Sequence, residues 1–289
     1  MRATNWNGGQ MSGIRIVTDS ASDLPRLEIE RHQIVVVLLD VRLGNDGPDV
    51  MRDLSTEEFW AKCAASAELP ETSAPSPGAF RDAFAAAADD GCDAVVCVTI
   101  SSALSATYQA ACTGAEEVNG RMPVQVVDSR SATMGEGLLV LEAARRAGEG
   151  GSADDIATAV RAAVDKIRVY GTLDTLENLR RGGRIGAAQA LLGSLLSIKP
   201  VIEIRDGVVE AESRQRTRTR SLQYLVDKVK SAGKVEHVSV LHAMASDVDT
   251  YVAMMAEAYP PEQTIVATIG PVIGTHAGPG AAGVAFQLA

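Results

Sequence analysis

Hydroxyl side chains gather at two places where a predicted strand gives way to a helix. Thr72 and Ser73 precede one helix, and Ser102 and Ser105 lie between a buried strand and the next helix. Hydroxyls together with the free amides of a helix N-terminus suit an anionic group. For any single hydroxyl, helix capping is the favoured interpretation. Because two such junctions occur in neighbouring strand–helix units, a shared anion pocket and simple capping stand as equal hypotheses.

A single histidine stands in the segment from Gly270 to Gly280, which is rich in glycine and proline. Such a loop can bring its backbone and the imidazole of His276 close to a ligand. An ordinary Gly-Pro turn with a surface histidine is the alternative interpretation. The other histidines lie in a polar helical stretch or flank an apolar strand, and we assign them no function: His32, His237 and His242.

Arginines cluster at two places in an otherwise acidic chain. Arg184 belongs to the basic turn from Leu179 to Ile185. A second group recurs at every other position: Arg214, Arg216, Arg218 and Arg220. Local basic clusters of this kind could bind an anion or an acidic partner. Spacing alone favours the simpler interpretation, which is a solvated face.

Several other chemistries lack their sequence signals. The chain has no GxxxxGK[ST] motif and no GxGxxG after its first predicted strand, so nucleotide binding is not indicated. It has no HExxH motif and no Cys/His cluster, so we expect no metal and no cofactor. A Ser-His-Asp hydrolase could be assembled from Ser102 or Ser105 with His276 and Asp19, but no GxSxG motif supports it.

The composition limits the classes of partner. Among 289 residues, Lys plus Arg number 27 and Asp plus Glu 37, which gives a net charge of −10. This balance argues against nucleic-acid binding and against docking on anionic membranes. The longest apolar runs, such as Ile34 to Leu39, are too short to span a bilayer. Four cysteines without a CxxC pair indicate reduced thiols in a cytoplasmic protein.

We expect three parts along the chain. Residues 1–13 are polar, contain no apolar signal-peptide segment and are predicted to be a disordered tail, with Met11 as an alternative start to Met1. Residues 14–168 are predicted to form an N-terminal α/β domain. Residues 169–289 are predicted to form a C-terminal α/β domain, with the boundary near 165–172.

The first half alternates short apolar runs with helical patterns, which predicts a largely parallel sheet covered by helices on both faces. Ser55 begins a helix with a capping-box spacing to Glu58, and Ser76-Pro77 begins another. Strands are predicted at residues 14–18, 34–39, 94–100 and 124–127. Further helices are predicted at residues 103–118 and 134–147, and Ser152 caps another.

The second half indicates antiparallel pairing. Two apolar runs, 201–204 and 208–212, flank Asp206-Gly207, which is a strong hairpin signal. Helices are predicted near residues 217–231 and 246–258, and strands near 235–242 and 264–269.

A short internal echo occurs at the ends of two predicted strands. Asp19-Ser20-Ala21-Ser22 and Asp128-Ser129-Arg130-Ser131 both follow an apolar run. Ligands approach open parallel sheets at the carboxyl ends of their strands. We therefore expect both turns to lie along the ligand-binding edge.

Taken together, these segments resemble the DegV family, which includes the fatty-acid-binding subunits of bacterial fatty acid kinase. The matching segments run in order over almost the whole chain: 16–20 with 23–25, 72–78, 100–108, 127–137, 176–185 with 188–189 and 199–200, and 274–280. The resemblance implies a two-domain α/β fold, with a mostly parallel N-terminal sheet and a second domain with antiparallel pairing. It also implies a long-chain fatty acid bound between or beneath the domains.

The resemblance further implies which residues hold the acid. Its carboxylate would be bound by Thr72 with Ser73 beside it, by Ser102 or Ser105, and by His276. The partner would be an ATP-binding kinase subunit, met by a basic surface that contains Arg184, Arg214 and Arg216. The chain departs from the family at three positions that could alter acyl preference, with Ala74 for the frequent Gln and with Ala103 and Ala106 for the frequent Gly.

Physical chemistry is consistent with this ligand. A buried carboxylate is costly unless several donors satisfy it, and hydroxyls with an imidazole supply donors without a permanent buried cation. Burying about fourteen methylenes at ~0.8 kcal/mol each offers roughly 11 kcal/mol as an upper bound. We therefore expect the tail to dominate affinity and the head to set orientation.

The resulting hypothesis is a lipid-binding carrier that performs no chemistry alone. It would present the carboxylate to a separate kinase, which makes an acyl phosphate. Two alternatives stay open at this point: an autonomous, esterase-like Ser/His hydrolase, and a binder of another small anionic ligand.

Overall fold

The first sheet of the protein is four-stranded and parallel. The computed structural model describes residues 13–48, 54–66, 68–191 and 198–289, so the expected disordered tail lies, apart from Gly13, outside the described residues. The strand order is β2-β1-β5-β6. These strands are β1 (Ile14–Asp19), β2 (Val35–Val37), β5 (Ala94–Thr99) and β6 (Val124–Asp128). The predicted parallel sheet is confirmed.

Helices cover both faces of this sheet, because successive strand side chains point to opposite sides. Val17, Val95 and Cys97 pack against α4 (Pro77–Asp89) and α5 (Thr107–Glu117). Val96 and Val98 face α6 (Met134–Gly148) and α7 (Ala153–Val164). Three predicted helix starts are confirmed by side-chain caps, at Ser55, Ser76 and Ser152.

The second sheet has six strands in the order β11-β10-β12-β7-β8-β9. Its pairings are antiparallel except for β10 with β11. The predicted hairpin at Asp206-Gly207 is confirmed. The strands are β7 (Ile167–Thr172), β8 (Lys199–Arg205), β9 (Val208–Gln215), β10 (Val235–His242), β11 (Ile265–Thr268) and β12 (Ala282–Leu288). α9 (Arg218–Ser231) and α10 (Val248–Met255) pack on one face.

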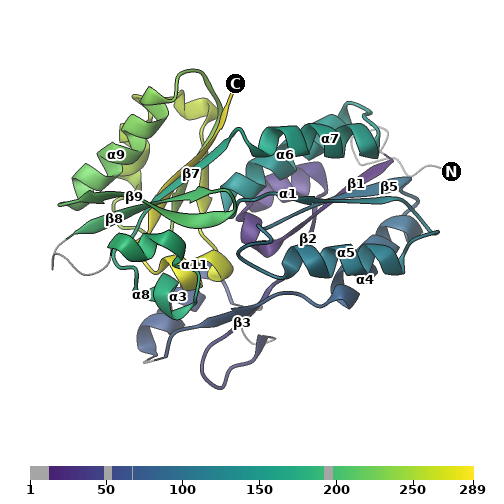
Figure 1. Cartoon of the computed structure of the whole chain (residues 1–289), viewed down its shortest axis with the longest axis horizontal. Coiled ribbons are helices and arrows are strands. Elements are labelled where there is room, and N and C mark those ends of the chain that lie inside the picture. The colour runs from purple at the N-terminus through teal and green to yellow at the C-terminus, as the bar shows by residue number, and fades with distance from the viewer. Residues whose placement is uncertain (1–12, 49–53, 67, 192–197) are drawn as a thin grey trace.

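The helix α6 lies between the two sheets and contacts strands of both (Figure 1). Gly135 permits this close approach, because a Cβ there would overlap Ser131 Oγ and Val169 Cγ2. A single apolar cluster therefore runs from the first sheet through α6 to the second, with Val96, Leu139 and Val169 among its buried members. The predicted division into domains 14–168 and 169–289 stays a prediction.

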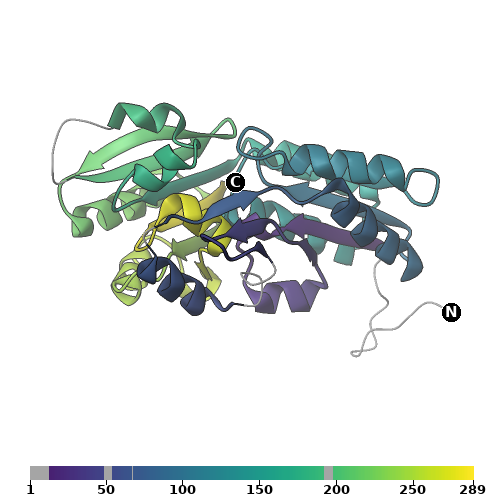
Figure 2. The ribbon, with the colours of Figure 1, turned by 90° about the horizontal axis from the view of Figure 1, so that it is seen from below.

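Smaller elements surround the junction of the sheets. A two-stranded antiparallel ribbon pairs β3 (Asp40–Arg42) with β4 (Glu71–Ser73). The remaining helices are α1 (Arg26–His32), α3 (Thr56–Ala65), α8 (Glu177–Arg181) and α11 (Pro271–Ala277), with 3-10 turns η1 (Ser20–Ser22), η2 (Gly186–Leu191) and η3 (Pro261–Gln263). Seen from below, α11 lies beside the segment that contains β4 (Figure 2).

Three features differ from the sequence predictions. The segment expected as a loop around His276 is helical, because Gly270 is its N-cap and Pro271 is accommodated at the first position. The helix predicted from Ala103 begins at Thr107, since the residues before it form the turn that leaves β5. The strands β3, β4, β7 and β12 were not predicted. Within the described residues, no helix is long and apolar enough to cross a membrane.

Candidate functional site

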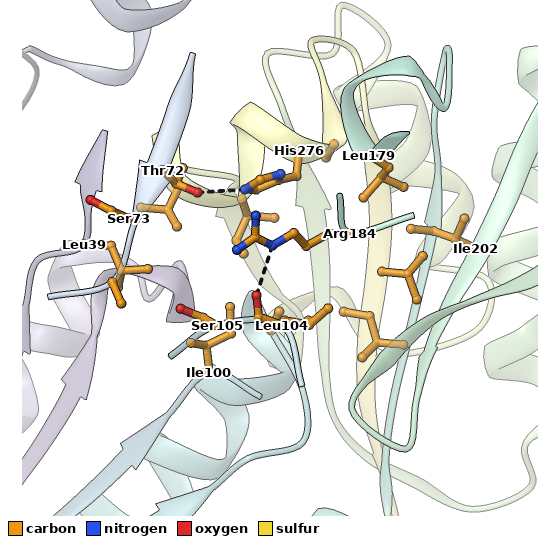
Figure 3. A pocket seen from close by; sticks show the side chains of 17 residues that line it. Leu39, Thr72, Ser73, Ile100, Leu104, Ser105, Leu179, Arg184, Ile202 and His276 are labelled. Atoms are coloured by element: carbon orange, nitrogen blue, oxygen red, sulfur yellow. Dashed lines mark hydrogen bonds between the residues drawn. The ribbon is translucent and has the colours of Figure 1, made fainter. Parts of the chain in front are cut away.

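A pocket opens at the carboxyl ends of the first sheet, where the second sheet and α11 approach them. Its volume is about 100 Å³, and most of its walls are apolar. Figure 3 shows its side chains converging from the segments that follow β2 and β5, from β4 and α11, and from the second sheet. The lining residues that carry the argument below are Leu39, Thr72, Ser105, Arg184, Ile202 and His276.

Two residues far apart in the chain meet at the wall of this pocket. Thr72 Oγ1 on β4 lies 2.8 Å from Nε2 of His276 on α11, across 204 positions of sequence (Figure 3). Both residues were predicted as carboxylate ligands from separate motifs. The ribbon β3–β4 and α11 contact each other, and this packing brings the hydroxyl and the imidazole together.

The surroundings of His276 favour a neutral imidazole. Burial, with the positive charge of Arg184 nearby, lowers its pKa from 6.5 to about 4. Nδ1 is buried without a hydrogen-bond partner among the described residues. A buried N–H without a partner is rare, so we assign the ring hydrogen to Nε2. Nε2–H then donates to Thr72, and the Thr72 hydroxyl is left able to donate to an anion.

Arg184 lines one side of the pocket and forms hydrogen bonds to two segments of the chain. Its Nε donates to the carbonyl oxygen of Leu104 at 3.2 Å, and Nη1 donates to that of Gly182 at 2.7 Å. Leu104 belongs to the turn after β5, and Gly182 follows α8. The guanidinium thus lies beside the imidazole and supplies positive charge at the apolar pocket.

The structure separates the predicted serines. Ser105 lines the pocket, and its hydroxyl lies 2.8 Å from Thr107 Oγ1. Ser73 also lines it, but its hydroxyl points away from His276 (Figure 3). Ser102 is not among the lining residues, because its hydroxyl donates to Asp128 Oδ2 at 2.5 Å. Ser105 is therefore the better-placed of the two alternative ligands.

A hydrolytic triad is not assembled here. Nε2 of His276 faces Thr72, and its Nδ1 has no carboxylate partner among the described residues. Asp19 is fully buried elsewhere, where it accepts hydrogen bonds from the backbone amides of Ala21 and Ile100. The orienting carboxylate that a Ser-His-Asp mechanism needs is thus occupied by structural bonds.

The internal echo explains how the turn after β5 is held. Asp19, at the end of β1, accepts from Ile100 N at 2.9 Å. Asp128, at the end of β6, accepts from Ser102 N at 3.2 Å. Because β5 lies between β1 and β6, the two aspartates clamp the turn from both sides. Both echo segments lie at the predicted sheet edge, but their side chains support the pocket instead of lining it.

A second, polar groove lies on the other side of the Thr72–His276 pair. Its volume is about 510 Å³. Polar and charged side chains line it, among them Glu68, Glu71, Asn178, Arg181 and Arg184. The pair therefore separates an apolar pocket from a polar groove, which is the arrangement an amphipathic acid requires.

Several site residues were not predicted from the sequence. Apolar walls come from β8, β9 and α11, through Ile202, Ile204, Val209, Val272 and Ile273. The alternation in the hairpin could have indicated Ile202 and Ile204 as facing one side. The predicted contact arginines Arg214 and Arg216 are exposed near the end of β9 and do not line the pocket.

Comparison with known proteins gives consistent matches over the whole length. A family model described as "Uncharacterised protein, DegV family" matches residues 13–288. A DegV domain-containing protein of Streptomyces coelicolor is 35% identical, covering 94% of this chain and 97% of that one.

Solved structures extend these matches to the fold. A DegV family protein from Thermus thermophilus, described by its fatty acid binding, is 32% identical with a TM-score of 0.84, covering 96% of this chain and 99% of that chain. DegV from Bacillus subtilis, described as a fatty acid binding protein, is 28% identical with a TM-score of 0.82 over the same shares.

Proposed function

Because this chain belongs to the DegV family, we propose that it binds a long-chain fatty acid and presents the carboxylate to a separate ATP-dependent kinase subunit. The kinase would transfer a phosphoryl group to make an acyl phosphate, and this protein would hold substrate and product. The observation that carries the proposal is the Thr72–His276 pair, which stands between the apolar pocket and the polar groove.

The tail is assigned to the apolar pocket. A cavity of ~150 Å³ accommodates benzene, so the present volume of about 100 Å³ holds only part of a long chain. Ile202, Ile204 and Val209 must therefore shift as the chain enters. Methylene burial contributes the larger part of affinity, at ~0.8 kcal/mol for each CH₂.

The head is assigned to the hydroxyl of Thr72 and to the neutral His276. Thr72 donates its hydrogen to the carboxylate while Nε2–H supports it, and Ser105 is the nearest further hydroxyl in the wall. Arg184 offsets part of the buried negative charge. These residues hold and orient the acid, and an imidazole that carries its hydrogen on Nε2 does not activate the Thr72 hydroxyl as a nucleophile. This agrees with the fatty-acid-binding descriptions of the relatives.

The kinase is assigned to the face on which the polar groove opens. Arg184 lies at the groove, while Arg214 and Arg216 are exposed near the end of β9. Basic side chains would attract an acidic surface of the kinase and raise the rate of encounter. Because the kinase uses ATP, the complex would act in the cytoplasm. This protein would need no cofactor of its own.

Lipid extraction tests the binding step directly. The purified protein is denatured and extracted, and the extract is examined by mass spectrometry for fatty acids in stoichiometric amount. Recovery of a fatty acid, or tight binding of added hexadecanoic acid, is expected. Absence of both would overturn the proposal, as would hydrolysis of a chromogenic ester that disappears in Ser105→Ala and His276→Ala.

His276→Ala is expected to impair presentation more than binding. In a reconstituted assay with the kinase subunit and ATP, acyl-phosphate formation should fall on the order of 100-fold, since the Thr72 hydroxyl that donates to the carboxylate loses the Nε2–H that orients it. Affinity for the acid should fall far less, because the tail is untouched. His237→Ala, an exposed histidine of β10, is the matched control. Wild-type rates in His276→Ala would contradict the proposed role.

A further inference from the structure

The helix that carries His276 is held at its start by a side chain from the other end of the chain. Asp23 Oδ1 accepts a hydrogen bond from the backbone amide of Gly270 at 2.9 Å. Gly270 is the N-cap of α11, and no side chain of its own caps this helix. Asp23 is itself buried and lies directly after η1. Asp23 thus supplies the acceptor for the N-cap amide of α11.

The other end of α11 is held from the second sheet's side of the molecule. Asn178 Nδ2 on α8 donates to the carbonyl oxygen of Thr275 at 3.0 Å. Thr275 directly precedes His276, so this bond fixes the peptide next to the imidazole-bearing residue. α8 and α11 also pack against each other. A helix of seven residues has few internal hydrogen bonds and depends on such external contacts.

We propose that Asp23 and Asn178 are positioning residues, which hold α11 so that Nε2 of His276 faces Thr72 and the ligand's head group. This inference rests on the proposed function for its ligand. Neither side chain belongs to the set lining the apolar pocket. Their loss should therefore disturb recognition of the head and leave the contacts of the tail largely in place. Sites of this kind tolerate displacements of only about 0.5 Å.

The test compares two probes that share a tail and differ in the head, hexadecanoic acid and hexadecan-1-ol. The dissociation constant of hexadecan-1-ol divided by that of hexadecanoic acid measures head-group recognition, and a general loss of stability or of tail packing leaves that ratio unchanged. We expect Asp23→Ala and Asn178→Ala each to reduce the ratio about tenfold. Asp23→Asn keeps a side-chain oxygen for Gly270 N and should retain the wild-type ratio within twofold. Asp249→Ala and Asn119→Ala, at exposed positions, are the matched controls.

A second measurement reports on the imidazole without any ligand. The His276 ring resonances, assigned by their loss in His276→Ala, should shift in both alanine variants and stay in place in Asp23→Asn. Should the alanine variants fail to fold, Asn178→Leu replaces them, because it removes the donor to the carbonyl oxygen of Thr275 without adding a charge. It should reduce the ratio while Asp23→Asn does not.

Two results overturn the inference. One is an unchanged ratio together with unchanged ring resonances in Asp23→Ala and Asn178→Ala, and the other is an Asp23→Asn variant that behaves like Asp23→Ala. Failure of the proposed function would look different. In that case the wild-type protein binds neither probe, while the ring resonances still report whether Asp23 and Asn178 position His276.

Discussion

The side chain of His276 is confined by a glycine as well as by its hydrogen bond. A Cβ on Gly182 would lie 2.7 Å from Cε1 of the ring and closer still to Nδ1. The ring is therefore held between the backbone after α8 and the hydroxyl of Thr72. Sequence reasoning identified Thr72 and His276 as candidates from their types and neighbours, but it assigned no role to Gly182 because a glycine carries no chemistry of its own.

Gly182→Ala is expected to displace the imidazole and to weaken binding of hexadecanoic acid about tenfold, with a smaller effect on hexadecan-1-ol. The physical reason is the overlap of the new methyl group with the ring, which cannot be relieved without moving Nε2 from Thr72. Titration calorimetry with both ligands provides the measurement. Gly148→Ala is the control, because a Cβ there meets open space. Equal affinities in the Gly182→Ala variant and the wild type would contradict this account.

The β8–β9 hairpin forms one wall of the pocket and is attached to the first sheet at its tip. Ser101 Oγ donates to the carbonyl oxygen of Gly207 at 2.7 Å, and Arg130 forms an ion pair with Asp206 at 2.5 Å. Ser101 is buried, whereas both ion-pair partners are exposed, so the hydrogen bond carries more of the attachment. The hairpin itself was predicted from Asp206-Gly207, but its docking on the turn after β5 was not.

Ser101→Ala is expected to lower the free energy of unfolding by about 1–2 kcal/mol, because the Gly207 carbonyl loses its donor in a buried setting. Urea denaturation of the variant and the wild type measures the difference. Ser231→Ala removes an exposed hydroxyl of α9 and should cost less than about 0.5 kcal/mol. Similar losses in the two variants would show that the hairpin tip does not depend on this bond.

Opposing titrations act on the stability of the whole molecule. Burial raises the pKa of Asp23 from 3.8 to about 7 and that of Asp19 to about 6. Between pH 3.8 and these raised pKa values, the two carboxyls hold protons in the folded protein that the unfolded chain has already released. The free energy of unfolding therefore falls as the pH rises through this interval. His276 acts in the opposite direction. Its pKa falls from 6.5 to about 4, so stability is lost as the pH decreases through that interval.

Asp23→Asn should change the pH dependence of stability in a defined direction. The variant lacks the carboxyl whose ionisation destabilises the folded state. Its free energy of unfolding, relative to that of the wild type, should therefore increase by roughly 2 kcal/mol from pH 5 to pH 8. Urea unfolding at both pH values provides the measurement, with the exposed Asp249→Asn as control. Parallel pH profiles of the wild type and Asp23→Asn would exclude this assignment.

Local patterns determined much of the protein before any tertiary structure was considered. Buried strands, helix caps and the Asp206-Gly207 hairpin depend on contacts within a few residues, so they can be identified from the sequence. The motifs containing Thr72 and His276 were visible for the same reason. The sequence did not predict β12, because its alanine and glycine residues have weak strand propensity. This strand is stabilised by pairing with β7 and β10.

Tertiary structure decided which hydroxyls meet the imidazole. Ser102 and Ser105 are three residues apart and chemically alike. The Ser102 hydroxyl nevertheless donates to Asp128, whereas Ser105 lines the pocket. The pairing of Thr72 with His276 spans 204 positions and depends on where the ribbon and α11 pack. Contacts over such separations arise from the packing of whole elements, which no short stretch of sequence encodes.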